Sequence, residues 1–301
     1  MRVLVTGASG LIGRHAVELL LEAGHAVRTL QRSPPLNRDA EYVQGDVETE
    51  PAKLTEAAKG CAAVVHLAGR GDVGESRRDP VGYARLNATG ALHALDAARL
   101  AGASFVLAST QRVYALRPEP RREDEAALQP DSPYGYAKWV AELWCRMASE
   151  QYGVPTTALR FFSVYGPGQE PNGASGVVTI FVRAALEGEP LVVRSAGRRD
   201  FTDARDAARG ICLAIERPVA GHRVYNIATG LGTSFAELAG LVREVTDSHS
   251  PIREAIGEPV GRDLVADLSR ARTELGYEAC VPLRAGLERY VEWLRQPRAS
   301  A

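Results

Sequence analysis

The chain has 301 residues, of which 45% are hydrophobic and 24% are charged, and its formal net charge is −1 at pH 7. This composition is ordinary for a globular protein of one large domain or two modest ones. The balanced charge excludes a nucleic-acid-binding surface, no apolar run is long enough to span a bilayer, and the four cysteines lack metal-binding spacing. We therefore expect a cytoplasmic protein with no metal, no nucleic-acid partner and no membrane contact.

The first predicted strand, Arg2–Thr6, runs directly into a glycine-rich turn, and an amphipathic helix is predicted over Arg14–Ala23. This order is that of a dinucleotide-binding fingerprint. Gly7 permits the tight turn, Gly10 lets the backbone approach a pyrophosphate, and Gly13 lets the helix pack against the strand. The free N–H groups at the helix start favour phosphate. A glycine-rich turn without a ligand is the alternative, but the unbroken helix favours a cofactor site.

The second predicted strand, His25–Leu30, ends in Gln31 and Arg32. A carboxylate at this point would bind both ribose hydroxyls, whereas a 2′-phosphate favours arginine. The absence of an acid here favours NADP(H) over NAD as the cofactor, although Arg32 could equally be a solvated charge. The next strand, Glu41–Asp46, places Asp46 either at the adenine amine or at the cap of the following helix, and both interpretations stay open.

A fourth strand, Ala62–Gly69, ends in small residues that allow a cofactor to lie across the sheet edge, and its His66 is expected to pack in the core. A long helix is predicted over Pro80–Gly102, with Asn87 near its start, and a strand over Ser104–Thr110. A loop rich in proline and charge, residues 116–131, is expected to face solvent and to cover a site. Strands alternating with helices predict a Rossmann-type, doubly wound parallel sheet.

The second half of the sequence changes character and predicts a smaller, mixed α/β lobe. Strands are predicted over residues 156–162, 190–194 and 223–228, and helices over 177–187, 206–216, 235–246 and 284–295. We expect residues 1–165, with about 197–226, to form the dinucleotide-binding domain. Residues of about 166–196, with 227–301, would form the substrate-binding lobe.

Tyr134 and Lys138 are four residues apart at the start of a predicted helix, so their side chains share one face. A free tyrosine has a pKa of about 10, which is too high for a base at neutral pH. A nearby ammonium group and an oxidised nicotinamide would lower it. Thr110, at the end of a neighbouring strand, could complete a Thr-Tyr-Lys set, although an exposed Tyr and Lys on a surface helix is the plain alternative.

These motifs resemble those of extended short-chain dehydrogenases/reductases of the NAD-dependent epimerase/dehydratase family, the nucleotide-sugar branch, over nearly the whole chain. The matching segments are Thr6–Gly13, Gly45–Asp46, His66–Gly69, Asn87–Gly90, Ser109–Thr110, Val113–Tyr114, Tyr134–Lys138, Arg160–Pro167, Arg199–Phe201 with Asp206, and Tyr225–Asn226. Together they are specific for the family and much less so for the reaction.

The resemblance implies a role for each matching residue. Thr110, Tyr134 and Lys138 would carry catalysis, and Arg199 would contact a nucleotide diphosphate through its guanidinium fork. The substrate would be a nucleotide sugar, held also by Ser163, Thr110 and Tyr134. The implied cofactor-binding residues are Gly7, Gly10, Leu11, Ile12, Gly13, Arg32, Asp46, Val47, Leu67, Ala68, Gly69, Asn87, Tyr134 and Lys138.

The implied mechanism is transient oxidation of the sugar to a ketone. Family dehydratases carry an Asp-Glu pair after the catalytic Thr, and sugar-acid decarboxylases usually carry a Glu there, but this chain has Gln111 and Arg112. The sequence therefore favours a 4-epimerase over an NADPH-dependent ketoreductase of a keto-sugar or other small carbonyl compound. A non-catalytic dinucleotide sensor is a third hypothesis, which the intact Thr-Tyr-Lys set disfavours.

Two departures from the family leave a non-nucleotide substrate open. Ser163 replaces the usual Asn that touches the diphosphate, and residues 195–197 replace a Gly-Asp-Gly stretch. The resemblance also implies a homodimer in which helices over residues 87–100 and 139–152 pair with their copies. Trp139, Leu143 and Met147 form an apolar stripe for that contact, and core packing explains the same stripe equally well.

Overall fold

The computed structural model describes residues 1–34, 37–115, 120–124, 128–170, 176–194, 196–255 and 263–296. Its centre is a seven-stranded sheet in the order β11-β6-β5-β4-β1-β2-β3, and every neighbouring pair is parallel. The strands are β1 (Arg2–Thr6), β2 (Ala26–Gln31), β3 (Glu41–Gln44), β4 (Ala63–His66), β5 (Ser104–Thr110), β6 (Thr156–Phe161) and β11 (His222–Ile227). This order confirms the predicted Rossmann-type, doubly wound fold.

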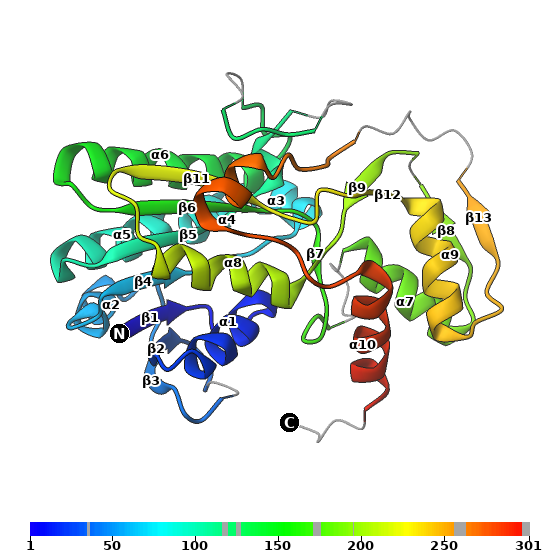
Figure 1. Ribbon diagram of the computed structural model, residues 1–301, viewed down its shortest axis with the longest axis horizontal. Helices are drawn as coiled ribbons and strands as arrows, with labels where there is room; N and C mark the ends of the chain where they lie inside the picture. The colour runs from blue at the N-terminus through cyan, green and yellow to red at the C-terminus, as the bar shows by residue number, and fades with distance from the viewer. Residues whose placement is uncertain are drawn as a thin grey trace.

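Helices cover both faces of the sheet (Figure 1). Helices α1 (Leu11–Glu22) and α8 (Ala204–Glu216) pack on one face, and α2 (Pro51–Ala58), α5 (Gly90–Ala101) and α6 (Pro133–Tyr152) on the other. The strands of this sheet are apolar at successive residues because both faces of the sheet are buried. In β1, Val3 and Val5 pack into the core on one face and Leu4 packs into the core on the other. The helix predicted over residues 80–102 is present as α4 (Pro80–Ala84), a π-helical turn (Arg85–Thr89) and α5, and α3 (Val73–Arg78) precedes it.

A smaller α/β lobe lies at the right of Figure 1, around its own apolar core. Its helices are α7 (Val177–Glu187), α9 (Phe235–Thr246) and α10 (Leu283–Arg295). Three two-stranded sheets accompany them: β8 (Leu191–Val193) with β13 (Ile252–Glu254), β9 (Arg198–Asp200) with β12 (Gly232–Ser234), and β7 (Val164–Tyr165) with β10 (Thr202–Asp203). The domain borders expected from the sequence stay a prediction.

The loop expected over residues 116–131 does not simply face solvent. Residues 116–119 and 125–127 lie outside the described residues, but Arg121 is fully buried and its N–H donates to Val265 O at 2.8 Å. Pairing with the segment around Ala266 therefore buries this part of the loop. In the described part of the chain, no helix has the length and apolarity needed to cross a membrane, and no cluster of acidic, His or Cys side chains could bind a metal.

Candidate active site

The turn between β1 and α1 leaves no room for side chains at two of its glycines. Gly7 has a φ of +69°, and a Cβ there would lie 2.5 Å from Ala68 N. A Cβ on Gly13 would lie 2.2 Å from Gly7 O, while Gly10 N–H donates to that same carbonyl at 3.0 Å. The turn is therefore tight, it lies against the segment that follows β4, and α1 starts close to the turn, which leaves a bare backbone cradle of the kind that accepts a pyrophosphate.

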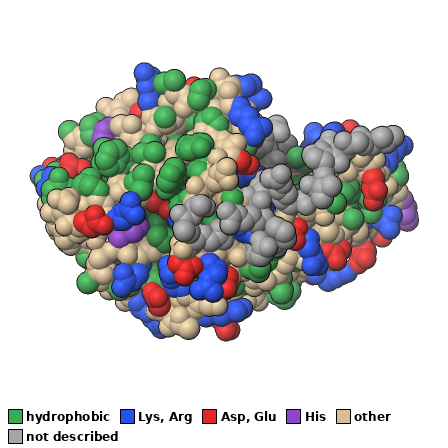
Figure 2. All heavy atoms as spheres, turned by 90° about the horizontal axis from the view of Figure 1, so that it is seen from above, with side chains coloured by type: hydrophobic (Ala, Val, Ile, Leu, Met, Phe, Trp, Pro, Cys, Tyr) green, Lys and Arg blue, Asp and Glu red, His purple; other side chains and the backbone are tan. Residues whose placement is uncertain are grey.

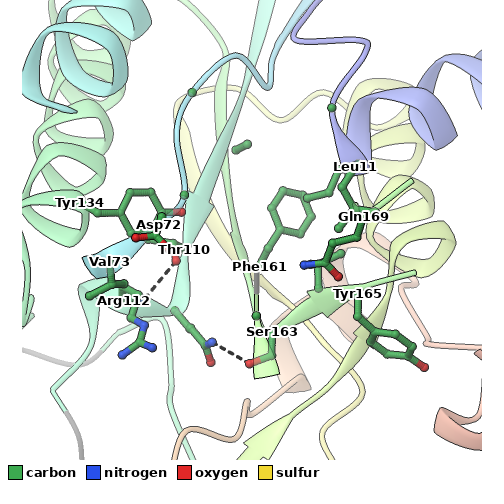
Figure 3. A pocket seen from close by; sticks show the side chains of 18 of the residues that line it. Leu11, Asp72, Val73, Thr110, Arg112, Tyr134, Phe161, Ser163, Tyr165 and Gln169 are labelled. Atoms are coloured by element: carbon green, nitrogen blue, oxygen red, sulfur yellow. Dashed lines mark hydrogen bonds between the residues drawn. The ribbon is translucent and has the colours of Figure 1, made fainter. Parts of the chain in front are cut away.

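This cradle forms the floor of a cavity of about 650 Å³ (Figure 3). The ends of β1, β4, β5 and β6, the start of α6, and residues of the smaller lobe line it. A second cavity of about 570 Å³ lies over the ends of β2 and β3. Both cavities are lined by Gly7, Gly10, Leu67, Gly69 and Arg70, so together they form one groove along the carboxyl ends of the strands. Ligands of doubly wound folds bind at this edge of the sheet.

Tyr134 lies in the first turn of α6, which Ser132 caps by accepting the Gly135 N–H at 3.3 Å. Its ring meets Tyr83 edge-on, and its hydroxyl points toward Thr110 at the end of β5 (Figure 3). Burial raises the pKa of Tyr134, and a hydrogen bond with Thr110 and the positive charge of Arg112 oppose that rise. The charge that opposes the rise in the pKa of Tyr134 is thus that of Arg112, whereas the sequence predicted this effect for Lys138.

Lys138 lies one turn further along α6 and faces the end of β4. Its Nζ would lie 3.3 Å from a Cβ on Gly69, and burial lowers the pKa of Lys138 to about 8. This buried ammonium group is placed to bind hydroxyl oxygens of a ligand on the cavity floor. His66 is a structural residue as predicted, because it is buried, its Nδ1 lies 2.9 Å from Thr6 Oγ1, and burial lowers its pKa to about 3.

The second cavity lies at the end of β2, where the sequence predicts that the cofactor ribose binds, and the residues at this strand end, Gln31 and Arg32, include no acid. Gln31 Oε1 accepts the Ser9 N–H at 2.9 Å, whereas Gln31 Nε2 is buried without a partner among the described residues and needs an acceptor. Arg32 is exposed beside it. Asp46 lines the same cavity and caps the turn after β3, since its Oδ1 accepts the Glu48 N–H at 2.8 Å.

The structure brings nearly all the predicted site residues to this groove. Thr110, Tyr134, Lys138, Ser163, Arg199, Gly7, Gly10, Leu11, Ile12, Gly13, Leu67 and Gly69 line the first cavity, and Arg32, Asp46, Val47 and Ala68 line the second. Asn87 lines neither. It is buried beneath the groove, where its amide bonds both the N–H and the carbonyl of Arg70 and so fixes the end of β4.

The wall opposite Tyr134 carries the residues expected at a substrate. Ser163 has a φ of +25°, a conformation that favours glycine or asparagine, and its Oγ accepts from Gln111 Nε2 at 3.0 Å. Arg199 on β9 stacks over the Phe235 ring at 5.4 Å, and burial lowers the pKa of Arg199 to about 10. Sequence reasoning missed the Gln111 contact and the lining residues Asp72, Val73 and Gln169. Ser195 lies outside the described residues.

A buried network supports the site from below. Glu142 on α6 pairs with Arg160 on β6 through two hydrogen bonds of 3.0 and 2.7 Å, and it also accepts from Ser109, the neighbour of Thr110. Arg160 Nη1 donates to the Tyr114 hydroxyl at 2.8 Å, and that hydroxyl donates to Asn226 Oδ1 on β11 at 2.7 Å. One helix and three strands are therefore held together by charged and polar groups.

Comparison with known proteins agrees with this geometry. The model of the NAD dependent epimerase/dehydratase family matches residues 3–228. The chain belongs to this family. It is 32% identical to UDP-glucose 4-epimerase of Mycolicibacterium smegmatis, with 98% of this chain and 99% of the relative covered. The resemblance stated from the sequence is thus confirmed, and the protein is an enzyme of the epimerase/dehydratase family.

Solved structures of family members extend the likeness to the whole fold. The UDP-glucose 4-epimerase of Thermotoga maritima, in complex with UDP-glucose, superposes with a TM-score of 0.87 at 32% identity, covering 98% of this chain and 99% of that one. MoeE5 was solved with NAD and UDP-glucose (TM-score 0.89) and with NAD and UDP-glucuronic acid (TM-score 0.87), each at 32% identity and with the same coverage.

Replacing Gly13 with alanine is expected to weaken cofactor binding and to destabilise the fold by about 1–3 kcal/mol. The new Cβ would lie 2.2 Å from the backbone oxygen of Gly7, so the pyrophosphate cradle must shift. Thermal unfolding with and without NAD⁺ measures both effects. Gly240→Ala is the matched control, because a Cβ there meets no atom within 4 Å inside α9 and should stabilise slightly. Unchanged cofactor affinity in Gly13→Ala would contradict the cradle.

Proposed function

We propose that this enzyme is an NAD(P)-dependent nucleotide-sugar 4-epimerase, with a UDP-linked hexose as substrate. The observation that carries the proposal is the meeting of Thr110 and Tyr134 with the glycine cradle and Arg199 in one cavity. The relatives support the same reaction, because UDP-glucose 4-epimerases match over nearly their full length and two similar structures hold UDP-sugars.

The roles of the residues follow from their positions. Tyr134 takes the proton of the sugar 4-hydroxyl and later returns it, while Thr110 hydrogen-bonds the same oxygen and limits the pKa of Tyr134. Lys138 would bind the ribose hydroxyls of the cofactor at the cavity floor. A bound nicotinamide would supply a reversible hydride acceptor. Arg199 pairs with the diphosphate and anchors it, and the keto-sugar turns about this anchor to take the hydride back on its other face.

The test is direct interconversion of UDP-glucose and UDP-galactose, followed by chromatography of the nucleotide sugars. Epimerisation without net consumption of NADH or NADPH is the expected result. Formation of neither epimer from either sugar, with no binding of UDP, would overturn the proposal. Tritium or deuterium at C4 should stay in the product, because the same hydride leaves and returns.

A second candidate is an NADPH-dependent ketoreductase, which the absence of an acid at the end of β2 favours. Gln31 Nε2, buried without a partner, and Arg32 are both donors suited to a 2′-phosphate. Such an enzyme would oxidise NADPH stoichiometrically with a keto-sugar. Stoichiometric loss of absorbance at 340 nm with a 4-keto-sugar, together with no epimerisation, would select the reductase.

The same two residues lead to a prediction about the cofactor. We expect NADP⁺ to bind at least as tightly as NAD⁺, and Arg32→Ala to lower the affinity for NADP⁺ by about tenfold while leaving NAD⁺ binding nearly unchanged. Fluorescence titration of the protein with each dinucleotide measures this. Arg38→Ala, another arginine in the segment between β2 and β3, is a suitable control. Tight NAD⁺ binding with equal losses for both cofactors in Arg32→Ala would refute the preference.

We also propose that the enzyme forms a homodimer through α5 and α6. Figure 2 shows hydrophobic side chains gathered on the upper face of the molecule, where α6 lies in Figure 1. Tyr136 and Tyr152 on α6 are 50% and 60% exposed, and Leu100 on α5 is 56% exposed. Trp139 packs against the core around Phe162, as in the core-packing alternative that the sequence left open for its stripe. A molar mass of one chain by light scattering would disprove the dimer.

A further inference from the structure

Arg112 is a charged residue of the site to which the proposed epimerase roles assign no contact with substrate or cofactor, although its charge lowers the pKa of Tyr134. It follows Thr110 and Gln111 in the short turn after β5 and lines the main cavity. Figure 3 shows its guanidinium group on the same side of the cavity as Tyr134 and Thr110, below Val73. A cation is therefore held beside the group that reacts, and it is also close enough to Arg199 for its charge to help lower the pKa of Arg199.

The backbone of Arg112 is fixed from two sides. Its N–H donates to Thr110 Oγ1 at 3.2 Å, and its carbonyl lies so close to Gly135 that a Cβ there would be 2.5 Å away. The side chain is half-buried and makes one ion pair, from Nη1 to Asp131 Oδ2 at 3.2 Å. Among the described residues its side chain bonds no other group. Since a guanidinium has five N–H donors, Arg112 keeps donors for a second carboxylate.

The charges around the cavity favour an anion. Among the described residues, four cationic side chains line it, Arg70, Arg112, Lys138 and Arg199, against one carboxylate, Asp72. Arg70 is neutralised by Glu75 and Asp79, and Asp72 caps α3 by accepting the Glu75 N–H. The proposed roles give Lys138 to the cofactor ribose, the helix start to the cofactor pyrophosphate and Arg199 to the substrate diphosphate. Arg112 is the cation of this set that these roles leave without a ligand group.

We propose that Arg112 binds a carboxylate on the sugar itself, so that the preferred substrate is a nucleotide-linked hexuronic acid. This inference rests on the proposed 4-epimerase function. When Tyr134 and Thr110 hold the 4-hydroxyl, the C6 carboxylate of a uronic acid lies two bonds from the reacting carbon, on the end of the cavity where Arg112 stands. The hydride that leaves C4 returns to C4, and the carboxylate keeps all its atoms. MoeE5, which is 32% identical to this chain, was solved with UDP-glucuronic acid and NAD.

The experiment compares kcat/KM for UDP-glucuronate and UDP-glucose in the wild-type enzyme, Arg112→Gln and Arg112→Lys. The wild type is expected to prefer UDP-glucuronate, and Arg112→Gln to lower the glucuronate-to-glucose ratio by at least about tenfold. Loss of a charge near Tyr134 should change the turnover of both substrates equally. The ratio of the two kcat/KM values is therefore unaffected by that change. Arg112→Lys should fall between the two, because it keeps the charge but not the forked geometry.

Asp131→Asn is the complementary variant, since it removes the carboxylate that competes for Arg112. It is expected to raise the ratio above that of the wild type. Binding of UDP alone separates the sugar from the diphosphate: if Arg112→Gln weakens UDP as much as UDP-glucuronate, Arg112 belongs to the diphosphate site and the inference is wrong. Efficient epimerisation of UDP-glucose with rejection of UDP-glucuronate overturns the inference and leaves the proposed function standing. Failure of both sugars and of UDP overturns both.

Discussion

Replacing Tyr134 with phenylalanine is expected to lower kcat by about 10²–10⁴-fold, while the affinities for UDP and for the dinucleotide stay close to those of the wild type. The substitution removes only the hydroxyl that faces Thr110 and keeps the ring that packs edge-on against Tyr83. Single-turnover formation of NADH or NADPH measures the oxidation step, and calorimetric titration measures binding.

Tyr136→Phe is the matched control, because this tyrosine lies two residues further along α6 and is half exposed. Thr110→Val adds a second readout. The Thr110 hydroxyl lowers the pKa of Tyr134, so its loss should move the rising limb of the kcat–pH profile to higher pH. Wild-type turnover in Tyr134→Phe would remove Tyr134 from the mechanism.

Glu142→Gln is expected to destabilise the protein by about 3–5 kcal/mol, because it leaves the charge of Arg160 buried without a counterion. Both side chains are almost fully buried, and the pair is bidentate, so the lost interaction is not replaced by water. The free energy of unfolding in urea measures the effect. We also expect a lower kcat, since Ser109 loses its carboxylate partner next to Thr110.

Two further variants test the cause of that loss. Glu150→Gln changes an exposed acid on the same helix and should alter stability by less than about 0.5 kcal/mol. The double variant Glu142→Leu with Arg160→Met removes both charges and should recover part of the stability lost in Glu142→Gln. Equal stability of Glu142→Gln and the wild type would show that the ion pair does not hold the sheet to α6.

The sequence was sufficient for the Rossmann sheet and the cofactor cradle, because both depend on local signals. The apolar run of β1, the glycines Gly7 and Gly13 and the helix behind them are contiguous in the sequence. Gly13 is required by the turn itself, because a Cβ there would meet Gly7 O, whereas the space at Gly7 is limited by Ala68 after β4. The four-residue spacing of Tyr134 and Lys138 likewise fixed their common helix face. Each of these features could be predicted from a short stretch of sequence.

The electrostatic interactions in the site could not be predicted from the sequence, because they join residues from different elements. Spacing showed that Lys138 follows Tyr134, but not that its Nζ turns toward Gly69 while Arg112, from another turn, supplies the charge near the phenol. The contact between Gln111 and Ser163 joins residues 52 positions apart. Asn87 matched a family motif, yet only the folded chain shows that it supports Arg70 from beneath.

The position of β11 has a consequence for how the chain emerges from the ribosome. This strand is the last of the central sheet to be synthesised, about 60 residues after β6, beside which it pairs. Until then β6, whose residues are all buried in the finished protein, is an open sheet edge with unpaired N–H and C=O groups. A nascent chain in this interval is exposed to strand-by-strand association with its neighbours, and we expect chaperones to bind it there.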